Sequence, residues 1–149
     1  HVAQVLLENR QVQTIGEAFD KYIGREGPAY VERLRVTPVE AVAVIARAGG
    51  VPVMAHPLPL GASAGLNPGL DLEEFIPPLI EAGMRGLEAY YTGYTASATA
   101  MLLDLARRYN LLVTGGSDYH GPQRLDAVLG NVYVPMRVVH RLKAAVGLV

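Results

Sequence analysis

The chain has 149 residues, half of them hydrophobic, and a formal net charge of -1 at pH 7. This composition predicts a compact globular domain with a sizeable core and excludes an intrinsically disordered chain. Its 13 Lys and Arg residues nearly balance its 14 Asp and Glu residues, which argues against a dedicated nucleic-acid-binding module. Because cysteine is absent, disulfides, zinc fingers and a cysteine nucleophile are excluded, and a metal would need His, carboxylate and water ligands.

The apolar stretches are too short for a membrane span. Arg47, Pro52 and His56 interrupt them well before the roughly 20 residues that a bilayer requires. The N-terminus also lacks a basic leader followed by an apolar segment. We therefore expect no membrane span, no secretion signal and a cytoplasmic location. The first residue is His1 rather than Met, as expected of a fragment of a longer protein.

Residues 1–36 differ in pattern from the rest of the chain and are predicted to form a short helical segment. Residues 2–7 and 15–22 have the spacing of two amphipathic helices. Thr14 and Glu17 have the spacing of a capping box that opens the second helix. A glycine-rich loop comes next, over residues 24–28.

Residues 37–149 alternate predicted helices with short, nearly all-apolar strands. The first of these helices has Thr37 as N-cap, Pro38 in its first turn and a capping-box Glu40. Pro77 and Pro78 should break the second helix, since proline removes a backbone donor and clashes with the preceding turn. The predicted helices cover residues 37–48, 71–82, 96–109 and 135–146. The predicted strands cover residues 51–55, 85–90, 111–114 and 131–134.

This alternation predicts an α/β fold with a parallel sheet covered on both faces by helices. The handedness of the crossovers leaves either a barrel or an open doubly wound sheet. Ligands bind at the carboxyl ends of the strands in both architectures. The polar side chains at those ends are therefore the candidate site.

Such side chains follow three of the predicted strands. His56 follows the first strand, Glu88 and Tyr91 lie at the end of the second, and Asp118 and His120 follow the third. A carboxylate and an imidazole two residues apart in a glycine-bracketed loop are suited to binding one ion of manganese, iron or zinc. The spacing thus makes Asp118 and His120 candidate metal ligands, and His56 is a weaker candidate because it stands alone.

Simpler interpretations of these residues stay open. His56 could be a hydrogen-bonded packing residue, and Asp118 could cap a turn beside an exposed His120. Glu88 could be a loop acid at the rim of the sheet. A Ser117 triad is disfavoured because residues 115–119 do not complete the G-x-S-x-G pattern.

Two cations of the N-terminal segment are candidates for holding a substrate phosphate. Arg25 lies in the glycine-rich loop and Lys21 one turn before it, and a planar guanidinium can bind two phosphate oxygens at once. The simpler alternative is a solvated helix end. His140, on the last predicted helix, is expected to be structural.

Three motifs resemble the later motifs of the PHP (polymerase and histidinol phosphatase) family. They are residues 50–57 (GVPVMAHP), 86–91 (GLEAYY) and 115–121 (GGSDYHG), in this order and spacing. Residues 22–31 (YIGREGPAYV) further resemble the branch of small PHP phosphoesterases that act on nucleotides and RNA ends. The resemblance covers nearly the whole chain.

The resemblance implies that the chain is the C-terminal part of a distorted seven-stranded β/α barrel. His56, Asp118 and His120 would be metal ligands, the last two also catalytic, in a site that holds up to three ions of Mn, Zn or Fe in the complete protein. Residues 1–36 would end a helical insertion that lines the cleft. His1 resembles a histidine near the substrate phosphate, and Glu88 and Tyr91 are expected to contact substrate with Arg25 and Lys21.

The implied function is hydrolysis of phosphate esters of nucleotides or oligonucleotide ends by a metal-activated water. The family's opening His-x-His motif and further ligands are absent from this chain, so the fragment alone is expected to be inactive. Two alternatives stay open: a non-catalytic PHP-like interaction domain, and an amidohydrolase-type enzyme acting on C–N bonds. Self-association is also expected, because part of a barrel leaves sheet edges unpaired.

Overall fold

The computed structural model describes residues 2–32, 35–58, 71–121 and 127–148. The chain divides into two compact units, His1–Val36 and Thr37–Val149. None of the helices in the described ranges combines the length and the apolar character that crossing a bilayer requires.

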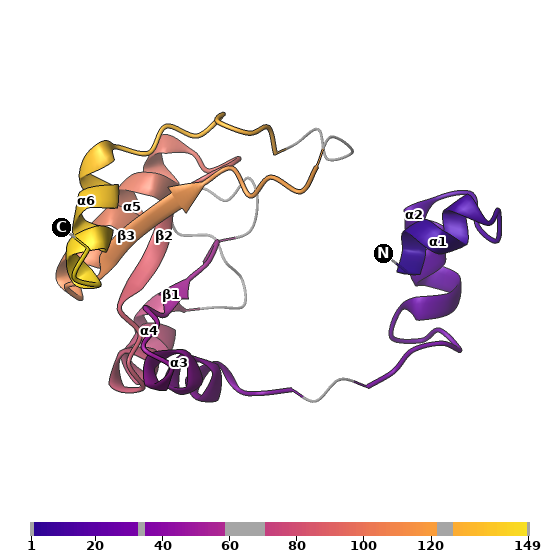
Figure 1. Ribbon diagram of the computed structural model, residues 1–149, viewed down its shortest axis with the longest axis horizontal. Coiled ribbons are helices and arrows are strands. Elements are labelled where there is room, and N and C mark those ends of the chain that lie inside the picture. Colours follow the sequence, from indigo (N-terminus) through magenta and orange to yellow (C-terminus); the bar gives the residue numbers. More distant parts are fainter. Residues whose placement is uncertain (1, 33–34, 59–70, 122–126, 149) are drawn as a thin grey trace. The chain divides into compact units, whose positions relative to one another are not determined.

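The first unit is helical. Helix α1 (Val2–Glu8) is followed by α2 (Ile15–Ala18), which runs directly into η1 (Phe19–Ile23), a π-helix (Figure 1). The sequence therefore predicted the helical residues but not this change in hydrogen bonding. The buried core of this unit consists of Ala3, Val12 and Ala18.

The predicted capping box at α2 is only half formed. The Thr14 Oγ1 atom accepts the Glu17 backbone N–H at 3.0 Å, as expected of an N-cap. The Glu17 carboxylate, however, accepts the backbone N–H of Gln13 at 2.7 Å and the ammonium of Lys21 at 2.6 Å. Glu17 thus links the start of α2 to η1.

The second unit contains a parallel three-stranded sheet in the order β1-β2-β3, which confirms the predicted α/β class. Its strands are β1 (Val53–Met54), β2 (Gly86–Tyr91) and β3 (Leu112–Gly116), and β1 is shorter than predicted. The predicted strand at residues 131–134 is wrong, because these residues pair with no strand in the described part of the chain. A strand exists only where a partner supplies its hydrogen bonds, and apolar composition does not reveal that partner.

Four helices accompany the sheet: α3 (Pro38–Arg47), α4 (Leu72–Glu81), α5 (Ala96–Arg108) and α6 (Met136–Ala145). In Figure 1, α5 lies beside β2 and α6 beside β3, and these pairs are in contact. The predicted capping box of α3 is complete, since Thr37 and Glu40 exchange hydrogen bonds in both directions.

Helix α4 is continuous through Pro77 and Pro78, so the predicted break is wrong. The two prolines remove the donors that would have bonded to the carbonyl groups of Glu73 and Glu74. Because both glutamates are exposed, water can satisfy those carbonyls. The buried face formed by Leu72, Ile76 and Leu79 keeps the helix against the core.

The core lies between the sheet and its helices. Ile76 of α4, Leu87 of β2 and Leu102 of α5 are completely buried. Each such side chain stabilises the fold by about 1.5–3 kcal/mol relative to an exposed position. Strand β2 is thereby anchored at the centre of the unit, and its carboxyl end carries two of the candidate site residues.

Candidate active site at the carboxyl ends of the strands

The structure brings together residues from the ends of all three strands. The Glu88 Oε2 atom accepts the backbone N–H of His56 at 2.8 Å. The Tyr91 hydroxyl donates to Asp118 Oδ2 at 2.9 Å, and the rings of His56 and Tyr91 lie 5.3 Å apart. As predicted, His56, Glu88, Tyr91 and Asp118 therefore come together at the carboxyl ends of the strands, which we call the strand-end edge.

A β-bulge in β2 makes this convergence possible. Glu88 is opposite Thr114 and Tyr90 is opposite Gly115, so Ala89 is an extra residue. In an unbroken strand, residues three apart face opposite sides of the sheet. The extra residue in the bulge shifts the alternation of side chains by one position. Glu88 can therefore contact His56 while Tyr91 contacts Asp118.

Gly115 allows the two strands to approach closely at the bulge. A Cβ atom at position 115 would overlap both the Cβ atom and the carbonyl oxygen of Tyr90. At the neighbouring Gly116, an added Cβ would meet nothing within 4 Å. Of these two glycines at the end of β3, Gly115 is required by the close approach and Gly116 is not.

Two predicted metal ligands have left-handed backbone conformations. The φ angle is 28° at His56 and 54° at Asp118. Such conformations cost about 1–3 kcal/mol in non-glycine residues, although aspartate adopts them more readily than most. Strain of this kind clusters at functional sites, although Arg10 and Asn110, which are not among the predicted site residues, also have positive φ angles.

His120 and Asp118 form a pair within their loop. The Nδ1 atom of His120 lies 2.5 Å from the Asp118 backbone oxygen and 3.6 Å from Asp118 Oδ1. Because a carbonyl oxygen can only accept, Nδ1 carries the proton in this contact. In the neutral ring, the Nε2 atom then keeps a lone pair available for a metal.

Burial raises the pKa of Glu88 above its ordinary value. The hydrogen bond from the His56 backbone and the charge of His56 oppose this shift, whereas the carboxylate of Asp118 reinforces it. Glu88 is thus partly removed from water at the strand-end edge, and the negative charge of Asp118 further favours its protonated form.

Within the described residues, no three His, Asp or Glu side chains lie close enough together to hold a metal ion. The available groups, two imidazoles and two carboxylates, have the nitrogen and oxygen donors that manganese, iron and zinc accept. The donor chemistry fits a divalent metal, and further ligands would have to complete the site.

Tyr94 and Thr92 also hold this edge together, and the sequence did not predict them. The Tyr94 hydroxyl accepts the Leu58 N–H at 2.8 Å and lies 3.0 Å from the Leu58 carbonyl oxygen, to which it donates. Thr92 Oγ1 donates to the Ser117 carbonyl at 2.9 Å. The one available signal was the concentration of tyrosines at the end of β2 and just after it.

The predicted phosphate-binding cations belong to the first unit. Lys21 is paired with Glu17, which raises the pKa of Lys21. Arg25 is exposed and has no ion pair among the described residues. Its loop requires glycine, since a Cβ at Gly24 would overlap the Phe19 carbonyl oxygen. His1 lies outside the described residues.

Three bacterial proteins show sequence similarity to the chain. A phosphoribosyl 1,2-cyclic phosphate 1,2-diphosphodiesterase of Eggerthella lenta is 39% identical over 82 residues, covering 55% of this chain and 28% of that protein. A 5′-3′ exoribonuclease of Haemophilus influenzae is 30% identical over 122 residues, covering 82% and 43%. A 3′,5′-nucleoside bisphosphate phosphatase of Chromobacterium violaceum is 29% identical, covering 82% and 41%. The chain therefore spans less than half the length of these relatives.

Two solved structures resemble the fold. One, from Bifidobacterium adolescentis, is proposed to be a metal-dependent phosphoesterase; it has a TM-score of 0.72 and 29% identity, covering 97% of this chain and 49% of that one. The other is an amidohydrolase of Chromobacterium violaceum with bound sulfate and no metal; it has a TM-score of 0.64 and 25% identity, covering 95% and 49%. No family model matches the sequence. The sequence and structural relatives of this chain are PHP-family phosphoesterases, and the chain, with its similar motifs and its parallel α/β architecture, corresponds to one part of their fold.

Proposed function

We propose that this chain is the C-terminal part of a metal-dependent phosphoesterase that hydrolyses phosphate esters of nucleotides or oligonucleotide ends. The observation that carries the proposal is the convergence of His56, Glu88 and Asp118 at one sheet edge, with strained backbone at His56 and Asp118. The relatives are named as a 5′-3′ exoribonuclease, a 3′,5′-nucleoside bisphosphate phosphatase and a phosphoribosyl 1,2-cyclic phosphate 1,2-diphosphodiesterase, and these names support the proposed substrate class.

The side chains at the edge fall into two groups. Asp118, His120 and His56 would bind the metal, and Asp118 and His120 lie where the chemical step would take place. Glu88 and Tyr91 each hydrogen bond to a predicted ligand residue, so they are suited to positioning His56 and Asp118. Contact of Glu88 and Tyr91 with substrate stays a prediction.

A divalent ion of Mn, Zn or Fe, when bound, would supply Lewis acidity towards phosphoryl oxygens and activate water for attack on phosphorus. The protein's own part is to orient the donors: the Nδ1 contact of His120 directs its Nε2 atom, and Tyr91 fixes one oxygen of Asp118. Arg25 and Lys21 would steady the substrate phosphate, with residues 1–36 lining the cleft. We also propose that the protein is located in the cytoplasm.

The test uses the complete protein, with this chain alone as a comparison. Asp118→Asn is the informative variant, because asparagine tolerates the left-handed backbone but lacks the anionic ligand. We expect the metal content to fall and the release of phosphate from a nucleoside 3′,5′-bisphosphate to drop roughly 100-fold or more. The matched control is His140→Gln on the exposed face of α6, which should retain both properties.

Two outcomes would count against the proposal. If Asp118→Asn changes only stability and the complete protein binds no metal, the non-catalytic interaction domain is the better interpretation. Robust turnover by this chain alone would contradict the inference that its ligand set is incomplete.

A second candidate is hydrolysis of C–N bonds, favoured by the similarity to the Chromobacterium violaceum amidohydrolase. Amide hydrolysis would use the same strand-end donors, so the fold does not separate the two reactions. A parallel screen of phosphate esters and cyclic amides with the complete protein decides between them. Turnover of cyclic amides without phosphate release would replace our proposal by this one.

A further inference from the structure

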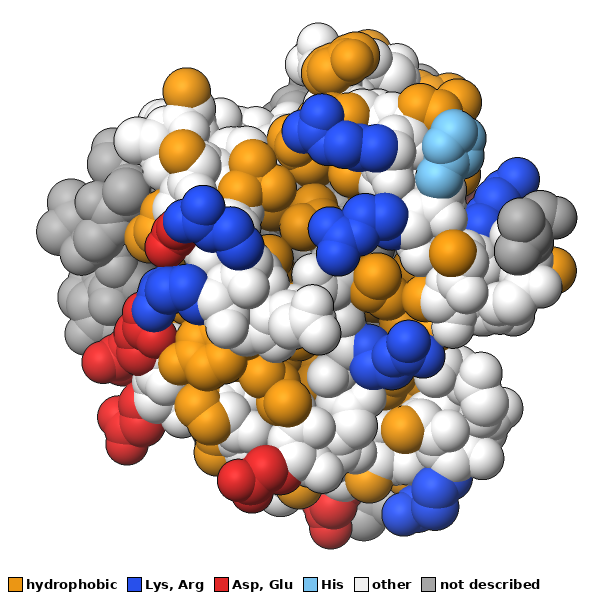
Figure 2. Space-filling view, turned by 90° about the vertical axis from the view of Figure 1, so that its left-hand side faces the viewer, with side chains coloured by type: hydrophobic (Ala, Val, Ile, Leu, Met, Phe, Trp, Pro, Cys, Tyr) orange, Lys and Arg blue, Asp and Glu red, His pale blue; other side chains and the backbone are white. Residues whose placement is uncertain are grey.

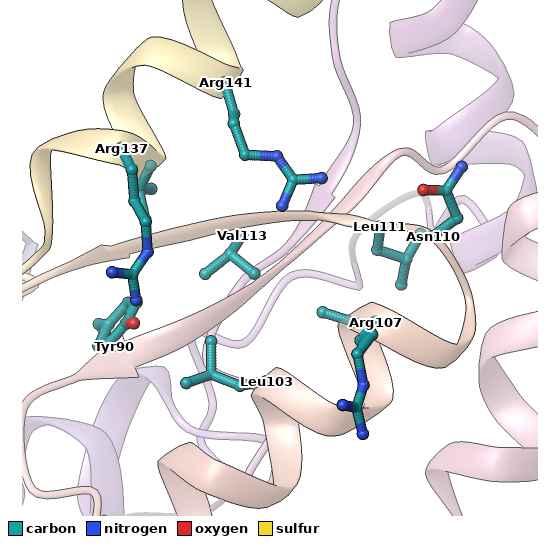
Figure 3. A pocket seen from close by; sticks show the side chains of 10 residues that line it. Tyr90, Leu103, Arg107, Asn110, Leu111, Val113, Arg137 and Arg141 are labelled. Carbon is teal, nitrogen blue, oxygen red and sulfur yellow. The ribbon is translucent and has the colours of Figure 1, made fainter.

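A second concave site lies away from the metal-ligand candidates, between α5 and α6. This cavity of about 220 Å³ is lined by Arg107 of α5 and by Arg137 and Arg141 of α6, and we call it the arginine cavity. In Figure 3, Arg137 extends from α6 towards Tyr90, and Arg141 extends over β3 beside Val113. Tyr90 lines the cavity, whereas the next residue, Tyr91, bonds to Asp118.

The cavity has an unbalanced positive charge. Arg107 forms an ion pair with Asp104, but Arg137 and Arg141 have no ion pair within the described part of the chain, and no carboxylate lines the cavity. Arg137 and Arg141 lie one turn apart on the same helix, where like charges repel and destabilise the helix. An anion bound between them would remove this repulsion.

The charge balance of the whole sequence concealed this local excess. The last acidic residue is Asp126, so residues 127–149 contain Arg137, Arg141 and Lys143 without any Asp or Glu. Figure 2 shows the corresponding face, on which Lys and Arg side chains are spread across the centre between patches of apolar surface. An electrostatic footprint for an anionic ligand is therefore present locally.

The remaining lining indicates the kind of anion. Leu103 and Val113 give the cavity an apolar floor, and Tyr90 adds an aromatic ring. Guanidinium groups bind phosphate oxygens in a bidentate manner, and an aromatic side chain offers a surface on which a base can stack. A small inorganic anion would use the arginines but not this floor.

We propose that the arginine cavity binds a phosphate group of a nucleotide or of single-stranded RNA, as a site separate from the strand-end edge. Arg137 and Arg141 would hold the phosphate, and the apolar floor with Tyr90 would hold the attached nucleoside. This proposal does not depend on hydrolysis at the strand-end edge, because it concerns binding by different side chains on different elements.

The test measures binding rather than turnover. Fluorescence anisotropy of a labelled single-stranded oligoribonucleotide, and calorimetry with adenosine monophosphate, would compare the unmodified chain with the double variant Arg137→Gln and Arg141→Gln. We expect at least one of the two ligands to bind roughly tenfold more weakly to the variant. For the oligoribonucleotide, loss of the one phosphate that both arginines hold should reduce the slope of log Kd against log salt concentration by about 0.7.

The matched control is the double variant Arg47→Gln and Lys143→Gln. It removes the same charge from exposed residues that do not line the cavity. A second variant, Arg137→Lys with Arg141→Lys, keeps the charge but removes the planar forks, and should bind more weakly than the unmodified chain. The affinities should show the same order in an Asp118→Asn background, which separates this site from the strand-end edge.

The outcomes are decisive in both directions. Weakened binding of adenosine monophosphate alone identifies a phosphate monoester site, and weakened binding of RNA alone identifies a phosphodiester site. Equal loss in the cavity variant and the control would show general charge attraction and overturn the proposal. Absence of binding by the unmodified chain would overturn it too, as would unchanged binding by a folded Arg137→Gln and Arg141→Gln variant.

Discussion

The backbone of Gly115 passes so close to Tyr90 that a methyl group at this position would overlap the tyrosine backbone. That approach is made at the bulge which turns Glu88 and Tyr91 towards the same group of residues. A single glycine thus connects the packing of two strands with the geometry of the candidate site. Its effect can be measured without knowing the ligand.

Gly115→Ala should lower the free energy of unfolding by about 1–3 kcal/mol, because the added Cβ forces β2 and β3 apart. Urea denaturation followed by circular dichroism measures this change. Gly116→Ala is the matched control and should change stability by less than about 0.5 kcal/mol, since its Cβ would meet nothing. Equal effects of the two substitutions would show that the close approach at the bulge is unimportant.

At the residue scale, the sequence indicated His56, Glu88, Tyr91 and Asp118 because each follows or ends an apolar run. What it did not indicate was how these residues meet. The bulge at Ala89 depends on the pairing of β2 with β3, which is a contact between distant segments. The Tyr94 contact with Leu58 likewise joins residues 36 positions apart, so no local pattern contains it.

At the element scale, the start of α4 and the end of α5 are joined by a polar cluster. Glu73 forms an ion pair with Arg108 at 2.5 Å and accepts a hydrogen bond from the Tyr109 hydroxyl at 2.9 Å. Arg108 and Tyr109 lower the pKa of Glu73 below its ordinary value. The side chains of Glu73 and Arg108 are about half exposed, so the effect of the ion pair on stability is modest.

The lowered pKa gives a definite pH dependence. Ionised Glu73 stabilises the folded chain above the ordinary glutamate pKa of 4.5, and this contribution disappears as pH falls through the lowered folded value. Glu73→Gln should therefore be less stable than the unmodified chain at neutral pH, with a difference that shrinks under acid conditions. Urea denaturation across this pH range measures it.

Glu74→Gln serves as control for that measurement. Glu74 is the next residue of α4, is also exposed, and forms no ion pair among the described residues. A pH-dependent difference of equal size in both variants would mean that general charge, rather than the contacts of Glu73, is responsible.

The elements were predicted best where the signal is local. Thr37, Pro38 and Glu40 define the start of α3 within four residues, and the structure agrees. The predicted break at Pro77 failed because burial of the opposite face outweighs two missing donors. The predicted strand at residues 131–134 failed because a strand depends on a partner that its own sequence does not specify.

At the scale of the whole molecule, the sheet ends at β1 on one side and at β3 on the other. Among the described residues, each of these strands is paired along one edge only. Unpaired strand edges are sites for association with another chain. The relatives are more than twice as long as the matched region, so a further part of the fold could cover these edges in the complete protein.

We predict that this chain by itself forms dimers or larger species in solution, and that the complete protein does so less. Size-exclusion chromatography with light scattering measures the mass of each. A monomer of about 16.0 kDa that persists at high concentration would contradict this prediction.

The left-handed backbone at His56 and Asp118 also has a thermodynamic consequence for binding. Folding has already restricted these two residues, so a ligand does not have to restrict them again. Ordering a flexible residue costs about 1–2 kcal/mol of conformational entropy, and preorganisation avoids this loss when the ligand binds. The same strain lowers the stability of the folded chain. If the proposed metal binds at these residues, stability and metal affinity are therefore set against each other, and relaxing either residue would improve the first at the expense of the second.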